Sequence, residues 1–202
     1  MLKIISDGGI VMWPLIICSI TSLTCIIERI LYWKRIYWHH KFSIDSSINI
    51  SNQTREIHIN YLKKNISFPL ANVLLMMSRK EYFDDKHFDL ILSTSIRRVA
   101  PEIRKFNSVF STIISVSPLL GLLGTILGLI NSFAFLSIGK AGFNAEKVTG
   151  GISEALVSTA TGLIIAIFTL IFANYFKSLA NKEFSFIHNC VLEYKTAKQL
   201  KI

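Results

Sequence analysis

Formal charge is almost missing from three long stretches of this sequence, and that absence indicates the class of protein. The apolar runs cover roughly residues 10–33, 110–138 and 152–176. The second run has no charged residue, the third has one glutamate, and the first has a Glu-Arg pair near its end. Each run exceeds the ~20 residues that an α-helix needs to cross ~30 Å of hydrocarbon. We therefore predict three transmembrane helices, in keeping with a mean hydropathy of +0.46.

Several other features are absent, and they narrow the function. The three runs contain no Asp, His or Lys, and no Ser/His, Cys/His or paired-Asp cluster occurs in or near them. Cys18 and Cys25 lie seven residues apart in the first run, and Cys190 lies in the tail, without metal-ligand spacing. We therefore expect no enzyme activity and neither a metal nor another cofactor. The first run is too long for a signal peptide, so we interpret it as an uncleaved span.

Positive charge is concentrated between the first and second runs and after the third. Residues 34–105 carry 13 Lys and Arg against 7 Asp and Glu, and the tail after residue 176 carries 5 against 2. The positive-inside rule places both segments in the cytoplasm. The predicted order is a periplasmic N-terminus at 1–9, spans at 10–33, 108–138 and 150–176, a cytoplasmic helical loop at 34–107, a periplasmic loop at 139–149 and a cytoplasmic tail at 177–202. Aromatic residues should mark the membrane interfaces, with Trp13 outside and Tyr32, Trp33, Tyr37 and Trp38 inside.

The long cytoplasmic loop is predicted to be largely helical. Apolar residues recur at helical spacing from Tyr61 to Arg79 and again from Phe88 to Phe106, where the pattern runs directly into the second span. Pro101 should kink this second helix or end it near residue 100. The predicted fold is an all-α membrane protein with three transmembrane helices and long cytoplasmic helical extensions.

The second span carries a stripe of small residues. A helical spacing places Pro118, Gly121, Thr125, Gly128 and Ser132 on one face. Such a stripe allows another helix to approach closely in lipid. Alternatively, this face lines a narrow pathway to which Thr125 supplies a hydroxyl. Both interpretations remain open here. Together with Gly124 and Gly162, the glycines and the proline are candidate packing positions.

The third span carries a carboxyl group close to its predicted start. With Thr149 as N-cap, Glu154 would lie in the first two turns, where a helix dipole stabilises negative charge. A carboxyl within a membrane is nevertheless expensive unless it faces protein or water, which makes Glu154 a functional candidate. On a helix, Glu154 and Thr159 lie about 140° apart. Ser158 and Thr161 share the face of Glu154 more closely.

Two threonines are expected at matching depth near the middle of the membrane. Thr125 and Thr159 lie ~15–18 Å from the predicted outer ends of their spans. A hydroxyl does not ionise usefully, and a proton relay normally needs a titratable group at that depth. If protons pass, a partner helix should supply the carboxylate. This chain would then form half of a channel.

The motifs of the three spans resemble the ExbB/TolQ/MotA family of proton-channel subunits. The similar residues are Gly8, Gly9, Trp13, Pro14, Glu28 and Arg29 in the first span, Ser117 to Gly128 in the second and Gly151 to Gly162 in the third. Three spans favour the ExbB/TolQ branch, and the short chain favours an ExbB-like protein. Ser158 and Thr161 depart from the family pattern, in which smaller or apolar residues are more usual.

This resemblance implies a pentameric ring in the bacterial inner membrane. Helices of two ExbD- or TolR-like partners, each with an essential aspartate, would pass through the pore, and a TonB- or TolA-like protein would receive the work. It also implies pore-lining roles for Thr125 and Thr159 and a pore-facing role for Glu154. Ser132, Ser158 and Thr161 are additional candidates for the pore surface. We expect the second and third spans to line the axis and the first to face lipid.

Three classes of function remain in competition. An ExbB-like channel would drive TonB-dependent uptake across the outer membrane, whereas a TolQ-like channel would act in envelope integrity. A non-conducting scaffold that stabilises a partner would share the same fold. An intramembrane enzyme is disfavoured by the missing catalytic clusters. The channel and the scaffold differ at Glu154, Thr125 and Thr159, because only a channel depends on the polar groups there.

Overall fold

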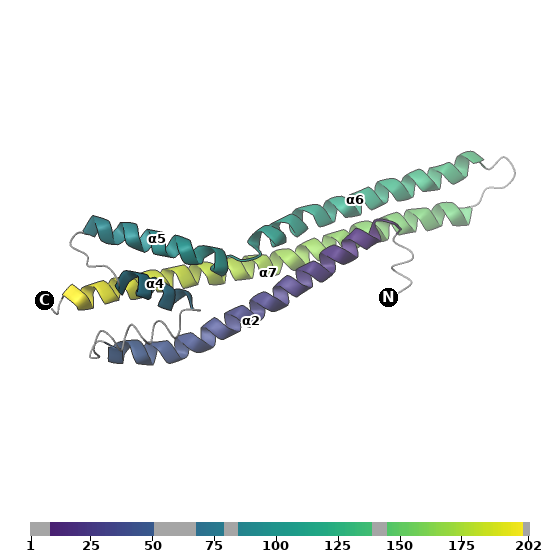
Figure 1. The fold of residues 1–202 in the computed structure, drawn as a ribbon. Coiled ribbons are helices and arrows are strands. Elements are labelled where there is room, and N and C mark those ends of the chain that lie inside the picture. The colour runs from purple at the N-terminus through teal and green to yellow at the C-terminus, as the bar shows by residue number, and fades with distance from the viewer. Residues whose placement is uncertain (1–8, 51–67, 79–84, 139–144, 200–202) are drawn as a thin grey trace. The chain divides into compact units, whose positions relative to one another are not determined.

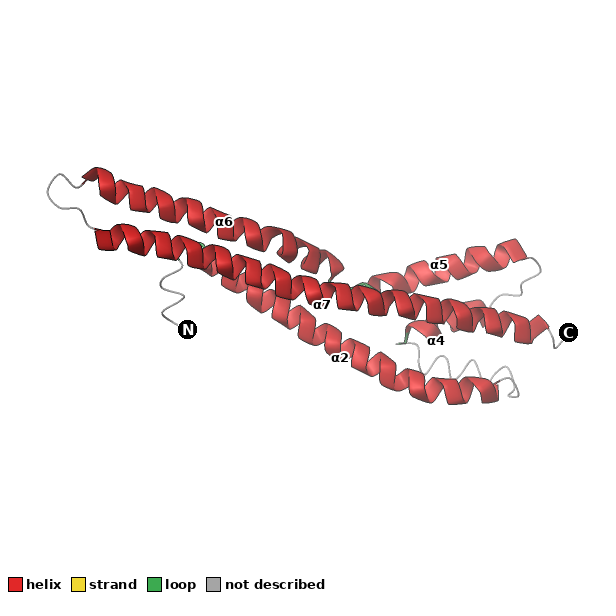
Figure 2. Ribbon diagram, turned by 180° about the vertical axis from the view of Figure 1, so that it is seen from behind, coloured by secondary structure: helices red, strands yellow, loops and turns green. Residues whose placement is uncertain are grey.

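The computed structural model describes residues 9–50, 68–78, 85–138 and 145–199 (Figures 1 and 2). The helices are α2 (Met12–Ile50), α4 (Pro69–Ser78), α5 (Asp85–Ile103), α6 (Asn107–Ile138) and α7 (Ala145–Gln199). These residues contain no strand, so the predicted all-α class is confirmed for the part of the chain that is described.

Three of these helices contain segments that are long and apolar enough to cross a membrane. The segments are Met12–Tyr37 of α2, Asn107–Ala134 of α6 and Val148–Glu193 of α7. The three predicted spans are therefore confirmed, and the protein is a multi-pass membrane protein. The segment in α7 has 46 residues. At ~1.5 Å per residue it is about twice as long as the hydrocarbon is thick, so α7 must extend beyond the bilayer core.

The chain divides into two compact units. The first unit contains Met1–Glu28 and Phe106–Tyr175, and the second contains Arg29–Lys105 and Phe176–Ile202. Two helices, α2 and α7, therefore contribute residues to both units. The first unit also contains α6, whereas α4 and α5 belong to the second.

In the first unit, α6 runs alongside the N-terminal half of α7, and α2 packs against both (Figures 1 and 2). Val11, in the turn before α2, forms a buried cluster with Met12 and Leu15 of α2, against which Leu120 of α6 and Ile165 of α7 pack. The opposite face of α2 is apolar and exposed, with Trp13, Ile17, Ile20 and Leu23 as examples. Exposed apolar side chains on a membrane span suit contact with lipid or with another apolar helix.

In the second unit, α5 buries one helical face. Phe88, Leu92, Val99 and Ile103 are all buried, at the spacing that the sequence pattern predicts. The shorter helix α4 contacts α5 and begins with Pro69, a residue well suited to the first turn of a helix because its missing N–H needs no acceptor there. The sequence predicts a helix from Tyr61 to Arg79. Pro69–Ser78 is helical, Phe68 precedes the helix in a bend, and the remainder lies outside the described residues.

The helix is interrupted between α5 and α6, as Pro101 predicts, although the interruption lies a few residues beyond residue 100. Pro101 lies inside α5, and the helix continues to Ile103 rather than ending near residue 100. One more turn is possible because the Arg104 N–H still donates to the Ala100 carbonyl, at 2.9 Å. The break instead follows at Phe106, whose φ of 67° is incompatible with a continuing right-handed helix.

A buried arginine stabilises the end of α5 within the second unit. Arg29 of α2 is only 1% exposed and donates to the carbonyls of Glu102 and Ile103, the last two residues of α5. Carbonyls at a helix end lack partners within the helix, and a cation there also complements the helix dipole. The Arg29 guanidinium lies 4.3 Å from the centre of the Tyr32 ring.

The aromatic prediction for the inner interface needs a correction. Trp33 is 9% exposed and lies against Arg29, with 5.6 Å between guanidinium and ring centre. Tyr32 and Trp33 therefore surround a buried cation instead of facing lipid. By contrast, Trp13 is 68% exposed and Tyr37 is 79% exposed, and their placement at the membrane interfaces stays a prediction. The side chain of Trp38 lies outside the described residues.

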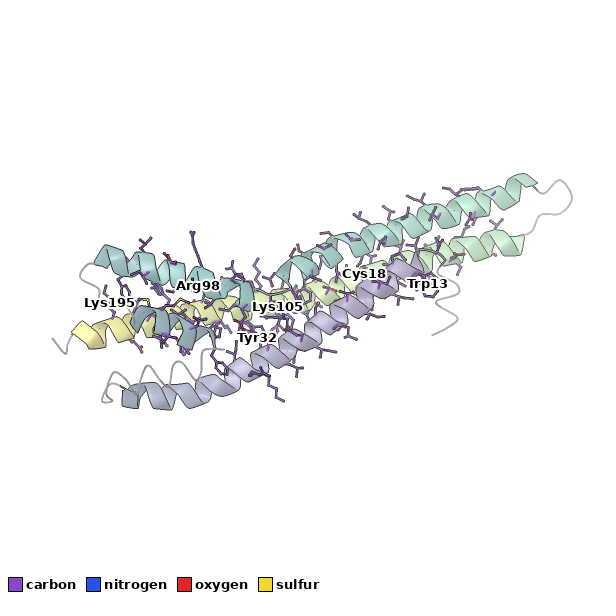
Figure 3. The ribbon with its side chains drawn as sticks, viewed as in Figure 1. Trp13, Cys18, Tyr32, Arg98, Lys105 and Lys195 are labelled. Carbon is purple, nitrogen blue, oxygen red and sulfur yellow. The ribbon has the colours of Figure 1, made fainter. Side chains whose placement is uncertain are left out.

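We expect Arg29→Ala to destabilise the protein by about 2–5 kcal/mol, because two helix-end carbonyls lose a charged donor. Arg29→Lys should recover only part of this loss, since an ammonium lacks the planar fork that can reach two carbonyls. Thermal unfolding of the detergent-solubilised protein, followed by circular dichroism, measures the effect. Arg98→Ala is the matched control, because Arg98 is exposed on α5 (Figure 3). Equal melting temperatures for Arg29→Ala and Arg98→Ala would contradict the proposed cap.

Candidate functional site

In the first unit, α6 and α7 contact each other through their backbones. A Cβ atom placed on Gly121 would lie 2.9 Å from Thr159 Cα, and one placed on Gly128 would lie 2.8 Å from Ala155 Cβ. On Gly162 it would lie 3.2 Å from Gly121 Cα. A methyl group at any of these glycines would have to move the helices apart. The structure thus places three of the predicted small residues in the contact between α6 and α7.

Two serines fill the same contact. Ser158 is 1% exposed and donates to the Ala155 carbonyl at 2.8 Å, and its side chain occupies the space that a Cβ on Gly124 would need. Ser132 is buried and donates to the Gly128 carbonyl at 2.9 Å. Within one chain, both serines therefore lie between α6 and α7. Pro118, the remaining member of the small-residue stripe, is half-buried within α6.

The two threonines are connected through one backbone carbonyl. Thr159 Oγ1 donates to the Gly121 carbonyl at 2.8 Å, which links α7 to α6. In an α-helix the same carbonyl also faces the N–H group four residues later, which belongs to Thr125. The partner of Thr159 is therefore one helical turn from Thr125. Both threonines are half-buried, so neither is sealed inside the helix pair.

The hydrogen bonds determine what each threonine can offer to an ion. Thr125 Oγ1 donates to the Leu122 carbonyl at 2.7 Å, as Thr159 Oγ1 does to Gly121. With its proton engaged, each hydroxyl oxygen still has lone pairs that accept hydrogen bonds. The pair can therefore receive a hydrogen bond from water, from a hydrated proton or from a protonated carboxyl group. Neither threonine provides a group that ionises.

Glu154 does not lie beside Thr125 and Thr159 but beside the start of α2. A Cβ on Gly9 would be 3.2 Å from the Glu154 Cδ and in still closer contact with Oε1. The helix that carries Glu154 begins at Ala145, so Thr149 lies inside α7 and is not its N-cap as predicted. Glu154 is consequently more than two turns from the start of its own helix. A helix dipole acts mainly on the first turn, so the dipole of α7 does not explain this carboxyl.

The structure separates two faces of α7 that the sequence left unresolved. Glu154 contacts the start of α2, and Ile165 packs on the cluster of α2, so these two residues mark the α2 side. Thr159 and Ser158 mark the α6 side. Thr161 is half-buried and donates to its own helix, at the Val157 carbonyl. Glu154 is therefore not brought together with the threonines within one chain.

Sequence reasoning missed two contacts of the first unit. The first is that of Gly9 with Glu154, although Gly9 belongs to a family motif. The second is a buried hydrogen bond of 2.7 Å between the hydroxyls of Ser22 in α2 and Thr169 in α7. A lone serine or threonine in an apolar span is a signal for an interhelical bond, but a single sequence does not identify its partner.

Comparison with known proteins identifies relatives over most of the chain. The model of the MotA/TolQ/ExbB proton channel family matches residues 54–189. A Synechocystis protein described as putative biopolymer transport protein ExbB-like 3 is 42% identical over 181 residues, covering 89% of this chain and 86% of the relative. A second Synechocystis protein, ExbB-like 1, is 32% identical over 89% of this chain and 71% of its own length. The biopolymer transport protein exbB1 of Vibrio cholerae is 27% identical over 79% of this chain and 71% of its own length.

We expect Gly121→Ala to destabilise the first unit by about 1–3 kcal/mol, the usual cost of forcing extra atoms into a packed contact. The added methyl group would collide with the backbone of Thr159, which cannot rotate away as a flexible side chain can. Gly150→Ala is the matched control, since a Cβ there meets nothing within 4 Å. Melting of both variants in detergent gives the comparison. A Gly121→Ala variant as stable as Gly150→Ala would show that α6 and α7 are not so close.

Proposed function

This chain belongs to the MotA/TolQ/ExbB proton channel family, and we propose that it is a channel-forming subunit of a motor that converts proton-motive force into work on the cell envelope. Three of its relatives bear names of ExbB type, which favours an ExbB-like role in TonB-dependent uptake over a TolQ-like role in envelope integrity. The chain would act without a reaction of its own and without a cofactor. Its task is to provide a pathway for protons.

One observation of the structure carries most of this proposal. Thr159 and Thr125 are linked through the carbonyl of Gly121, in a helix pair whose other outward residues are mainly apolar. Half-buried hydroxyls that retain free lone pairs offer hydrogen bonds in a region where lipid offers none. A scaffold would need the glycines of this contact for packing. It would not need the hydroxyl of Thr125, which among the described residues bonds within its own helix, to the Leu122 carbonyl.

The missing titratable group determines the kind of partner. By the predicted depths, Thr125 and Thr159 would place hydroxyls near mid-membrane, whereas the carboxyl groups of Glu28 and Glu154 would lie nearer the ends of their spans. We therefore propose that a single-span ExbD- or TolR-like protein supplies an aspartate, and that a TonB- or TolA-like protein is driven. Several copies of this chain, five by family resemblance, would surround the partner in the bacterial inner membrane, with the N-terminus in the periplasm and the C-terminus in the cytoplasm.

The exposed surface of the first unit is compatible with such a ring. Leu119, Leu122, Ile126 and Ile130 of α6 are exposed, and so are Leu163 and Ile167 of α7. Apolar side chains on a span must meet lipid or another apolar helix. Neighbouring copies would cover part of this surface, while the sides that carry Thr125 and Thr159 would face the partner. Glu154 would lie at the outer end of the pathway.

We expect Thr125→Val and Thr159→Val to reduce proton flux by roughly 5- to 150-fold, which corresponds to ~1–3 kcal/mol for each unsatisfied polar group. Both substitutions nearly preserve volume. The measurement is acidification of liposomes that contain the chain with its single-span partner and a pH-sensitive dye. Thr159→Ser keeps the hydroxyl and should retain most of the flux. Thr24→Val is the matched control, because Thr24 is exposed on α2 and bonds only to its own helix.

Assembly must be measured beside the flux, because Thr159→Val also removes the bond between α7 and α6. Native gel electrophoresis of the solubilised complex shows whether the ring forms. Normal flux through both valine variants in an intact ring would reject the channel and leave the scaffold. Loss of assembly in Thr159→Val alone would assign that hydroxyl to packing. The proton flux through Thr125→Val would then decide between the channel and the scaffold.

A further inference from the structure

Glu154 and Gly9 form a contact that neither the packing of α6 nor the threonine pair explains. Gly9 begins the turn that leads into α2, with a φ of +65°, and its carbonyl accepts a hydrogen bond from the Met12 N–H at 3.1 Å. The side of Gly9 on which other residues carry a Cβ is filled by the carboxyl of Glu154, with Cδ 3.2 Å and Cγ 3.7 Å from that position. The carboxyl group therefore rests directly on the backbone of this turn.

The electrostatics of this place favour a negative charge. The first N–H groups of a helix have no acceptor within the helix, so the start of α2 carries partial positive charge. Glu154 is nine residues from the first residue of α7 but contacts the residue three positions before α2. The neighbouring helix, rather than its own, is thus the one whose dipole acts on this carboxylate.

We propose that Gly9 is a positioning residue for Glu154, and that the turn at the head of the first span holds this carboxyl at the outer end of the proton pathway. The proposal rests on the proposed function. It assigns a role to the first span, which would otherwise serve only to cover the helices of the pathway. The carboxyl would be held by the shape of the turn and by the field of α2.

Two properties of Gly9 matter for this role, and both are specific to glycine. A side chain at this position would occupy the space of the carboxyl and displace it. A positive φ is also costly for residues that have a Cβ. The experiment must separate these effects, because backbone strain alone could also lower activity.

A double-mutant cycle separates displacement of Glu154 from strain at Gly9. We expect Gly9→Ala to reduce proton flux in the liposome assay by roughly tenfold or more, since small displacements of a working group have large effects on rate. Glu154→Asp withdraws the carboxyl by one methylene, about 1.5 Å. It should therefore make room for the methyl group, and the double variant should conduct better than Gly9→Ala alone. Strain at Gly9 does not depend on residue 154, so it would leave the two effects additive.

A cross-link tests the contact without any reference to conduction. Cysteines introduced by Gly9→Cys and Glu154→Cys, in a chain whose Cys18, Cys25 and Cys190 are replaced by serine, should form an intrachain disulfide on mild oxidation. The matched control pairs Gly9→Cys with Gly150→Cys, because no atom lies within 4 Å of a Cβ on Gly150. Peptide mass spectrometry of the membrane-embedded protein distinguishes intrachain from interchain links.

The outcomes are distinct. Cross-linking of 9 with 154 but not of 9 with 150, together with rescue of Gly9→Ala by Glu154→Asp, supports the positioning role. Normal flux in Gly9→Ala, additive effects in the double variant, or failure of the 9–154 cross-link overturns it. If the native protein with its partner conducts no protons, the proposed function fails and the role of Gly9 in conduction fails with it. In that case the cross-link still reports on the contact itself.

Discussion

The approach of α6 to α7 at Gly121 is the constraint on which the rest of the first unit depends. At this point the two backbones are so close that a methyl group would lie 2.9 Å from Thr159 Cα. Only that proximity allows the Thr159 hydroxyl to reach a carbonyl of the other helix, at 2.8 Å. A larger residue at position 121 would therefore remove both the packing and the polar link. The close contact of the two backbones and the hydrogen bond of Thr159 therefore both require a small residue at position 121.

This arrangement bears on an ambiguity that the sequence presents. Close packing and a polar pathway appear as alternatives in the stripe on the second span, and the structure assigns only part of the stripe to packing. Gly121, Gly128 and Ser132 lie in the contact with α7, whereas Thr125 is half-buried at its edge. Packing brings the backbones together and leaves the side chain of Thr125 at the edge of the contact. The same division holds on α7, where Ser158 is buried and Thr159 is not.

Much of this architecture could be predicted from the sequence because the membrane imposes strong rules. A stretch of about 20 apolar residues with almost no charge identifies a transmembrane span. Apolar residues at helical spacing identify the buried face of α5. Contacts between distant residues were not predictable. In the sequence, Arg29 is simply a charged residue near the end of a span. In the structure it is buried and hydrogen-bonded to the end of α5. Threonine is a residue type preferred at N-caps, which led to Thr149 as the predicted start of the third helix. The helix α7 begins at Ala145 instead.

Thr159 and Glu154 of α7 differ in the interactions that they need from their surroundings, and this explains why they lie on different faces of the helix. A threonine satisfies its own proton within the helix pair, so it can stand in an apolar region at little cost. A carboxylate cannot, because it only accepts hydrogen bonds and its charge must be balanced. Glu154 meets part of that need beside Gly9, at the start of α2, because the first N–H groups of a helix carry partial positive charge.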